Sequence, residues 1–565
     1  MTPEEKIGQL FVYVSTGRFM NESSPEYQRL LHHVRDNHIG GIHWGTWSLV
    51  HETAFLNRQL QKAARIPLLV SADLESGVGM RFADVTYWPW AMAVGATGDP
   101  SLARRQGEVV AQEARTIGLN QIYAPVADVN VNPANPVINV RSYGEDPETV
   151  ARFVSAFVEG VQSKGVLATV KHFPGHGDTQ VDSHRSIPIL RISRDRLDRV
   201  ELVPFRAAVA AGAASIMTAH VSLPALDDTP APPLREEARR NVYDPEGTEV
   251  ALDATIPASL SPKITHDLLR EELGFQGLIV TDALDMGGIT VHFDPGEAAV
   301  QALLAGADQV LKSPQLDDAI AGVRRAVASG RIPRGRIDEA VERVLAAKAR
   351  FRAPRPSPRK AFHVVDSVEH RALAGEIARR AITLVREEPQ ALPLLGSRRL
   401  VHIAVQGAVE AQFEDLTREL GLRLEQPPET FSLDARSGEQ EVAEVIEGVG
   451  RGDVVLLSLF VRFRSGEGRI SIPEAAVGAI QRIAAAGKPI IAVAFGSPFL
   501  IQELPELRTY LVAYGGQEVM QVATAQALFG EIPVTGRLPV TIPDVAARGG
   551  GIQKPASATA PVPRP

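Results

Sequence analysis

Residues 168–188, ATVKHFPGHGDTQVDSHRSIP, begin as a strand and end as a polar loop. The apolar run before Lys171 predicts a buried strand, and Pro174 and Gly177 predict the loop that follows it. Three of the 14 histidines of this 565-residue chain fall in the stretch, far more than an even spread would give. Ionisable groups where a buried strand opens into a loop are typical of a site of chemistry.

The first part of the chain alternates short apolar runs with amphipathic stretches. Eight strands are expected, over Leu10–Val14, Gly40–Trp44, Leu68–Glu75, Gln121–Ala127, Leu167–His172, Ser215–His220, Leu278–Ala283 and Asp308–Lys312. Helices are expected between them, over 101–118, 149–164, 195–212, 262–273 and 315–328. This alternation predicts an α/β fold, a (β/α)8 TIM-type barrel whose active site lies where the strands end.

The second part repeats the alternation on a smaller scale and predicts an α/β/α sandwich domain. Its expected elements are a helix over 369–384 and strands over Leu400–Val405, Val454–Leu459, Ile490–Phe495 and Tyr510–Tyr514. Prolines and basic residues mark an interdomain linker, and a Gly/Pro/Ala-rich end predicts disorder. The expected domains are the catalytic barrel over 1–351, the linker over 352–366, the sandwich over 367–547 and a disordered tail over 548–565.

Composition narrows the class of protein. The 59 basic and 67 acidic residues give a net charge of −8, which argues against nucleic acid or an anionic membrane as partner. The absence of cysteine excludes disulfides, thiolate nucleophiles and cysteine-based zinc sites. We expect a monomer or homodimer with no cofactor and no metal.

The N-terminal sequence reads as a helix start, with Thr2 as N-cap, Pro3 in the first turn and Glu5 closing a capping box. It shows no signal peptide, so the chain as given is expected to be soluble and cytoplasmic. A secreted, periplasmic or lipoprotein location would follow if a leader had been trimmed. The longest uncharged run, 207–226, is expected to be a helix end followed by a buried strand and not a membrane span.

Two polar segments interrupt this pattern. Residues 227–256 are expected to be an insertion at the rim of the barrel, as a flap or a solvated loop. The loop 462–469, RFRSGEGR, is either a solvated surface or a segment that reaches the substrate.

Three interpretations of residues 171–184 are open from the residue types. The histidines are hydrogen-bonded in a polar loop, or they ligate zinc or iron with the aspartates. In the third, His184 is a general acid/base held in orientation by Asp182, since a carboxylate on one ring nitrogen fixes the tautomer. His176, within the glycine turn, is expected to be structural.

A reaction partner for the histidine is offered by Asp282, in GLIVTDALDMGG over 277–288. It follows a strongly apolar strand, where an aspartate serves packing poorly. It is either the cap of a following helix or a nucleophile that attacks while the histidine protonates the leaving group and later activates water.

Four motifs carry a resemblance to a known family. KHFPGHGDTQVDSH (171–184), TAHVSLPALD (218–227), GLIVTDALDM (277–286) and NPVINVRSYGEDP (135–147) resemble family 3 glycoside hydrolases, in particular their β-N-acetylglucosaminidase branch. The beginning TPEEKIGQLF and the late segment ALFGEIPVTGRLPVTIP (527–543) are similar to two-domain members, so the resemblance spans nearly the whole chain.

The resemblance implies a role for each matching residue. Asp282 is the nucleophile of a retaining mechanism, His184 the acid/base and Asp182 its partner. Lys171, His172 and Arg141 bind the hydroxyls and the N-acetyl region of the sugar. Asp73 and Arg81 bind a second set of hydroxyls.

The expected function is a retaining exo-acting β-N-acetylglucosaminidase that removes non-reducing terminal N-acetylglucosamine from cell-wall fragments or chito-oligosaccharides. The alternatives within the family are a β-glucosidase or β-xylosidase, or a β-N-acetylglucosaminide phosphorylase that uses phosphate in place of water. Two alternatives from other classes are a non-catalytic carbohydrate-binding protein and a metal-dependent hydrolase.

Overall fold

The computed structural model describes the chain except residues 236–252, 408–412, 465, 467, 559 and 561–565. The chain forms two compact units. Unit 1 comprises Met1–Thr86, Ala103–Val129 and Pro147–His370, and unit 2 comprises Tyr87–Leu102, Asn130–Asp146 and Arg371–Pro565. Two segments that the sequence division assigned to the barrel thus pack within the second unit.

Unit 1 is a parallel eight-stranded barrel over the residues described, in the order β7-β6-β5-β4-β3-β2-β1-β8. A parallel bridge between Val280 and Gln309 brings β7 beside the start of β8, so the barrel is nearly closed. This confirms the expected barrel, and each strand lies in its expected run or within one residue of it. The strands are β1 (Phe11–Ser15), β2 (Gly41–Trp44), β3 (Leu69–Ala72), β4 (Gln121–Ile122), β5 (Leu167–Phe173), β6 (Ser215–Thr218), β7 (Leu278–Thr281) and β8 (Val310–Leu311).

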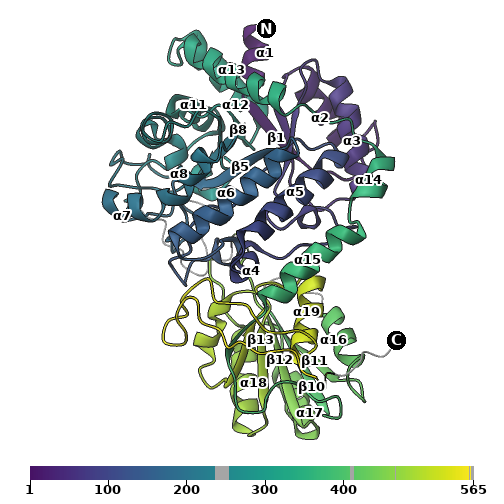
Figure 1. Cartoon of the computed structure of the whole chain (residues 1–565). Coiled ribbons are helices and arrows are strands. Elements are labelled where there is room, and N and C mark those ends of the chain that lie inside the picture. The colour runs from purple at the N-terminus through teal and green to yellow at the C-terminus, as the bar shows by residue number, and fades with distance from the viewer. Residues whose placement is uncertain (236–252, 408–412, 465, 467, 559, 561–565) are drawn as a thin grey trace. The chain divides into compact units, whose positions relative to one another are not determined.

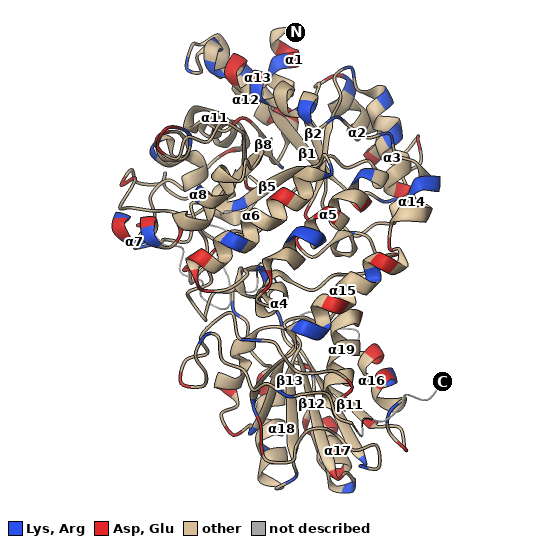
Figure 2. Ribbon diagram, viewed as in Figure 1, with Lys and Arg blue, Asp and Glu red and all other residues tan. Residues whose placement is uncertain are grey.

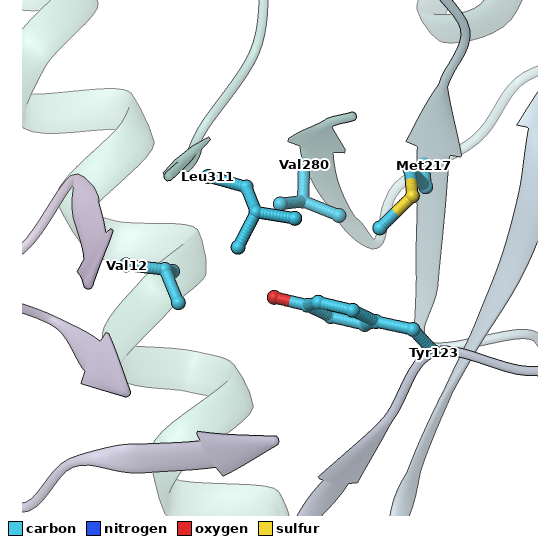
Figure 3. Close-up of a cluster of buried hydrophobic side chains, with 5 residues drawn as sticks. All are labelled: Val12, Tyr123, Met217, Val280 and Leu311. Atoms are coloured by element: carbon cyan, nitrogen blue, oxygen red, sulfur yellow. The ribbon is translucent and has the colours of Figure 1, made fainter. Parts of the chain in front are cut away.

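The barrel interior is filled by side chains from strands on opposite sides. Figure 3 shows Tyr123 lying across the centre, with its hydroxyl directed toward Val12 and Leu311. Met217 and Val280 complete the cluster, and all five side chains are almost fully buried. The floor below the rim is therefore solid, as in other small barrels, and chemistry is confined to the strand ends.

Helices surround this barrel, as Figure 1 shows for α5, α6 and α8. The early helices are α1 (Pro3–Gly8), α2 (Pro25–Arg35), α3 (Val50–Ala63), α5 (Pro100–Ile117), α6 (Pro147–Ser163), α7 (Arg194–Arg199) and α8 (Leu202–Ala210), with the short turn η1 (Val78–Met80). The later ones are η3 (Ala258–Leu260), the π-helical η4 (Lys263–Glu272), α10 (Gly287–Thr290), α11 (Pro295–Ala305), α12 (Leu316–Ala328), α13 (Arg334–Arg350) and α14 (Pro358–Val364).

Local signals in the sequence account for several of these helices. The capping box of α1 is confirmed, because the Thr2 hydroxyl accepts from the Glu5 N–H at 3.2 Å and Glu5 accepts from the Thr2 N–H at 2.8 Å. The uncharged run 207–226 holds the end of α8 and then β6, as expected. Among the described residues, no helix is long and apolar enough to cross a membrane.

One expectation in unit 1 is wrong, and another gains detail. The single helix expected over 195–212 is broken into α7 and α8 at Val200, whose φ of −125° and ψ of −72° lie outside the helical range. The expected linker contains α14, so it is partly helical. The insertion 227–256 lies largely outside the described residues, and its described base pairs Pro230 with Thr255.

Unit 2 contains a six-stranded sheet over the described residues, in the order β11-β10-β12-β13-β14-β9, parallel except for the β14–β9 pair. This confirms the expected α/β domain. Its strands are β9 (Thr383–Arg386), β10 (Leu400–Gln406), β11 (Glu429–Leu433), β12 (Val454–Phe460), β13 (Ile490–Ala494) and β14 (Thr509–Val512). Its helices are α4 (Ala91–Ala96), η2 (Asn139–Arg141), α15 (Val368–Ala381), α16 (Glu414–Gly421), α17 (Glu439–Arg451), α18 (Glu474–Ala485), η5 (Pro498–Glu503) and α19 (Glu518–Leu528).

Two further expectations are wrong in unit 2. The helix expected over 369–384 ends at Ala381, because Thr383 begins the edge strand β9. The tail is not disordered from Arg548 onward: Ile552 bridges to Leu384, and Lys554 bridges to Val534. The two edge strands of this sheet, β9 and β11, were not predicted from the sequence.

Charged residues lie mainly on the helices and loops of both units. Figure 2 shows α7 carrying acidic and basic residues together, whereas the ribbon of β1 and β2 is uncharged. This distribution is the usual consequence of burying strands beneath amphipathic helices.

Candidate active site

The strands of the barrel deliver four acidic or basic groups to one end. Asp73 directly follows β3, Lys171 and His172 lie near the end of β5, and Asp282 directly follows β7. The Asp282 N–H donates to the carbonyl of Thr218 at 2.9 Å, which continues the β6–β7 ladder to this residue. The carboxyl ends of parallel strands meet at one rim, so these groups share one end of the barrel.

Lys171 is held between two carboxylates. Its Nζ lies 2.7 Å from Asp73 Oδ1 and 2.7 Å from Glu75 Oε1, and its side chain is almost fully buried. Arg81 donates to Asp73 Oδ2 at 2.8 Å. Burial alone would raise the pKa of Asp73, but the cations of Lys171 and Arg81 outweigh it and hold that pKa well below its usual range. Asp73 is therefore an ionised acceptor, suited to sugar hydroxyls.

His43 lies beside this group. Its Nε2 is 3.4 Å from Asp73 Oδ2, and its Nδ1 is 3.1 Å from Ser71 Oγ. Its ring stacks on Tyr123, with centroids 4.8 Å apart. Burial lowers the pKa of His43, so the ring is neutral. It packs between Asp73 at the rim and Tyr123 in the barrel interior.

Asp128 joins two histidines of the loop. Its carboxylate is 2.7 Å from His172 Nδ1 and accepts the backbone N–H of His176 at 2.7 Å. Burial alone would raise the pKa of Asp128, but the two histidines outweigh it and the pKa is lowered. Next to Asp128, Val129 has its carbonyl against Gly177, where a Cβ would come within 1.9 Å. The carboxylate thus fixes the His172 ring and the start of the loop together.

His176 has hydrogen-bond partners at both ring nitrogens. Nδ1 lies 2.7 Å from Thr179 Oγ1, and Nε2 lies 3.1 Å from Ser183 Oγ. Burial lowers the pKa of His176 to about 4, so it is neutral near pH 7. These contacts connect His176 to two later residues of the same loop, which agrees with the structural role expected for it.

His184 and Asp182 form a pair at the end of the same loop. The ring Nδ1 and the backbone N–H of His184 both lie within hydrogen-bond distance of Asp182 Oδ1, at 2.7 and 2.9 Å. The carboxylate accepts from Nδ1–H, and that tautomer presents Nε2 for proton exchange. Asp182 is buried, whereas the His184 side chain is 37% exposed.

This pair is attached to the segment that follows Asp282. The N–H of Gly287 donates to the His184 carbonyl and that of Gly288 to the Ser183 carbonyl, both at 3.1 Å. At Gly287 a Cβ would come within 2.5 Å of the His184 carbonyl oxygen, so the close approach requires glycine. Two backbone bonds therefore fix the histidine loop against the loop that starts at Asp282.

Asp282 is surrounded by histidines. Burial alone would raise the pKa of its carboxyl, but His220 and His172 oppose that effect most strongly and the pKa lies below its usual value. The Ala283 N–H donates to Asp282 Oδ1 at 2.7 Å. The helix-cap interpretation is excluded, because α10 has Met286 as its N-cap. An ionised, partly buried carboxylate with low pKa is the form that a nucleophile needs.

His220 is a neighbour of Asp282 that is not suited to proton transfer. Its Nε2 donates to the Ala283 carbonyl at 2.9 Å, which leaves Nδ1 to accept from the Ser259 hydroxyl at 2.7 Å. Burial lowers its pKa. His220 thus holds the backbone that carries Asp282, and His184 remains the candidate acid/base.

Arg141 lies in unit 2. Its Nη1 donates to the Val137 carbonyl at 3.1 Å, and its guanidinium lies over the ring of Phe463, 5.5 Å from the centroid. Arg141 therefore belongs to unit 2, whereas the other seven candidate residues belong to unit 1. Phe463 belongs to the loop 462–469, of which Ser465 and Glu467 lie outside the described residues.

The structure thus groups Asp73, Arg81 and Lys171 in one network and pairs Asp182 with His184. Three further buried groups, Glu75, Asp128 and His220, were expected at the strand ends but were not among the candidate site residues. Each directly follows or lies close to the end of a strand, which was the available signal. The histidines over 172–184 have carboxylate or hydroxyl partners, and none belongs to a group of three converging ligands within the described residues.

The chain is similar to known glycoside hydrolases over most of its length. The model of the glycosyl hydrolase family 3 N-terminal domain matches residues 2–347, and that of its C-terminal domain matches 382–559. The chain is 32% identical to a β-N-acetylglucosaminidase/β-glucosidase of Cellulomonas fimi, over 96% of this chain and 94% of the relative. It is 33% identical to a β-hexosaminidase A of Pseudoalteromonas piscicida, over 61% of this chain and 57% of the relative.

Two solved structures share the whole architecture. A family 3 β-N-acetylglucosaminidase from Paenibacillus sp. str. FPU-7 has a TM-score of 0.80 at 33% identity, with 96% of this chain and 99% of that chain covered. A β-glucoside phosphorylase, BglX, has a TM-score of 0.83 at 27% identity, with 96% and 94% covered. Two family models that together span most of the chain, and a relative aligned over nearly its full length, establish that this chain belongs to glycosyl hydrolase family 3.

Proposed function

We propose that this enzyme is a retaining exo-β-N-acetylglucosaminidase that acts on cell-wall fragments or chito-oligosaccharides. The observation that carries the proposal is the Asp182–His184 pair, attached by two backbone hydrogen bonds to the loop that begins at Asp282. The preference for the N-acetyl sugar is supported by the names of the Paenibacillus β-N-acetylglucosaminidase and the Pseudoalteromonas piscicida β-hexosaminidase A, whereas the Cellulomonas fimi relative is named for both activities.

In the first step, the Asp282 carboxylate attacks the anomeric carbon as the bond to the leaving oxygen breaks. His184 Nε2–H gives its proton to that oxygen. In the second step, the neutral Nε2 takes a proton from water, and the resulting oxygen nucleophile displaces Asp282 from the anomeric carbon. Two displacements at one carbon retain its configuration. No metal or cofactor is needed for these proton and electron-pair movements.

The remaining candidate residues bind the sugar. Asp73 and Arg81 present an acceptor and a donor in fixed geometry, with Lys171 between Asp73 and Glu75. His172, with Nδ1 bound by Asp128, directs its other edge to the sugar. Arg141 is assigned to the N-acetyl region on the strength of its motif. We assign the chemistry to the barrel over 1–351 and a supporting role to the domain over 367–547, in a monomer or homodimer.

A second acceptor has a specific observation in its favour. BglX, with nearly the same overall fold, bears the name β-glucoside phosphorylase. In this alternative, an oxygen of phosphate replaces water in the second step, and the product is a sugar 1-phosphate of retained configuration.

Initial rates on matched aryl β-glycosides of N-acetylglucosamine and glucose test the proposal. A strong preference for the N-acetyl sugar, abolished by His184→Ala, is expected. Preference for glucose would overturn the assigned specificity, and full activity of His184→Ala would overturn the assigned acid/base. Product analysis with and without inorganic phosphate separates hydrolysis from phosphorolysis, because only phosphorolysis yields the sugar 1-phosphate.

A further inference from the structure

A second group of histidines lies outside the active site, where helices α2 and α12 meet. His32 and His33 are in the last turn of α2, and Asp317 is in the first turn of α12. One ligand atom from each lies within 4.8 Å of the others. His32 Nε2 is 3.2 Å from Asp317 Oδ1, and His33 Nδ1 is 4.0 Å from the same oxygen.

These distances are close to those of a tetrahedral metal site. Zinc binds histidine nitrogen and carboxylate oxygen at roughly 2.0–2.2 Å, which places neighbouring ligand atoms about 3.3–3.5 Å apart. The His32–Asp317 pair already has nearly this spacing, and His33 needs to approach by about half an ångström. Because His33 is buried, the adjustment would come from His32 and Asp317, whose side chains are 45% and 61% exposed.

The surroundings of the two rings favour ligation. His32 Nδ1 lies 2.9 Å from Asp36 Oδ2, so its proton is directed to that carboxylate and the lone pair of Nε2 points toward Asp317. A carboxylate behind a ligating histidine fixes the tautomer and increases its basicity. His33 is buried, and its ring lies 4.5 Å from that of Tyr13, which fixes the position of its Nδ1.

The amide of Asn37 marks the point where the lone pairs converge. Its Nδ2 is 2.6 Å from Asp317 Oδ1, 3.0 Å from His33 Nδ1 and 3.4 Å from His32 Nε2. An amide has two protons for these three acceptors. Rotation of the amide would instead present Oδ1, a further ligand oxygen.

We propose that His32, His33 and Asp317 bind a divalent transition-metal ion of the zinc class, which connects α2 to α12. These helices flank the position where the first strand of the barrel pairs with the last, β1 with β8. The ion is structural: it shares no residue with the active site and takes no part in turnover. The competing state of the cluster is a protonated His32 bound by Asp36 and Asp317.

Equilibrium dialysis of the untagged full-length protein against Zn²⁺ and Co²⁺, followed by elemental analysis, tests the proposal. One equivalent per chain is expected, with the visible absorption of tetrahedral Co²⁺. Asp317→Asn and His32→Gln are each expected to weaken binding at least tenfold. The matched control is His266→Ala, which removes an exposed histidine that lies 2.9 Å from a carboxylate of Asp267 and belongs to no ligand cluster in the described part of the chain.

Thermal unfolding provides a second readout. Zn²⁺ is expected to raise the Tm of the wild type and of His266→Ala, but not that of Asp317→Asn, because a ligand that binds only the folded state stabilises it. Glycosidase activity is expected to be unchanged by Zn²⁺ or by chelator. Absence of saturable binding, or equal binding by all three variants, would overturn the proposal without affecting the proposed function.

Discussion

Two aspartate–histidine pairs at the barrel rim have the same hydrogen-bond distance but differ in their exposure to solvent. Asp182–His184 and Asp128–His172 both join a carboxylate oxygen to Nδ1 at 2.7 Å. The His184 side chain is 37% exposed, whereas that of His172 is 7% exposed. A hydrogen bond of this kind fixes the tautomer in both cases, so it does not by itself identify a catalytic histidine. Access to substrate and water separates the two.

The contacts of the two carboxylates differ as well. Asp182 binds the ring and the backbone N–H of the same residue, His184. Asp128 binds the ring of His172 and the backbone N–H of His176. The first carboxylate thus serves one proton-transferring group. The second organises a loop, and we infer that Asp128 is a positioning residue.

The largest effect is expected at the carboxylate that both pairs surround. Asp282→Ala should lower kcat on the order of 10⁴-fold or more, because the covalent route is lost. In the wild type, the acid limb of kcat/KM should lie below the usual aspartate value of about 3.9, since a lowered pKa keeps the nucleophile ionised to lower pH. A kcat within tenfold of the wild type for Asp282→Ala would refute its assignment.

The next largest effect is expected for the exposed pair. His184→Ala should lower kcat by about 10²–10⁴-fold with poor leaving groups and by much less with good ones, which need no protonation. His172→Ala should not show this dependence on the leaving group. A series of aryl β-N-acetylglucosaminides with leaving groups of graded acidity measures the difference. Equal slopes of log kcat against leaving-group pKa for the two variants would mean that His184 is not the residue that protonates the leaving group.

Isosteric amides in the two pairs should have smaller effects of different kinds. Asp182→Asn removes the anion that favours protonated His184, so the alkaline limb of kcat/KM should move to lower pH. Asp128→Asn should lower kcat/KM by about 10–100-fold with the alkaline limb unmoved, because the change misplaces a ring rather than altering the acid. A shifted limb in Asp128→Asn would count against a positioning role.

The smallest effect concerns stability. Burial lowers the pKa of His176 to about 4, whereas in the unfolded chain it is near 6.5, so the unfolded state binds more protons between these values. The contribution of His176 to the free energy of unfolding is therefore complete above about pH 6.5. It decreases as the pH drops toward 4, by about 2 kcal/mol between pH 7 and 5. Urea unfolding at the two pH values should show a smaller pH dependence for His176→Gln. An unchanged dependence would contradict the buried neutral state.

The sequence predicted those elements and contacts whose signal lies within a short stretch of chain. The eight apolar runs predicted the barrel because each is long enough to cross it, and the spacing of Asp182 and His184 predicted their pairing. Runs without this signal were missed: the edge strand β11 holds exposed and half-buried residues, and β9 continues directly from a helix. Helix 195–212 was predicted as one element because nothing in its periodicity shows the break at Val200.

For the site, the sequence by itself determined which ionisable residues end the strands and which neighbours lie within one loop. Only the tertiary structure decided the partners that are distant in the chain: Asp128 with His172, Lys171 between Asp73 and Glu75, and His32 beside Asp317. For the groups at the rim, the physical reason is that parallel strands bring their carboxyl ends together whatever the length of chain between them, whereas His32 and Asp317 meet because α2 and α12 lie close together. Burial, which sets the protonation state of each group, follows from that packing and not from the order of residues.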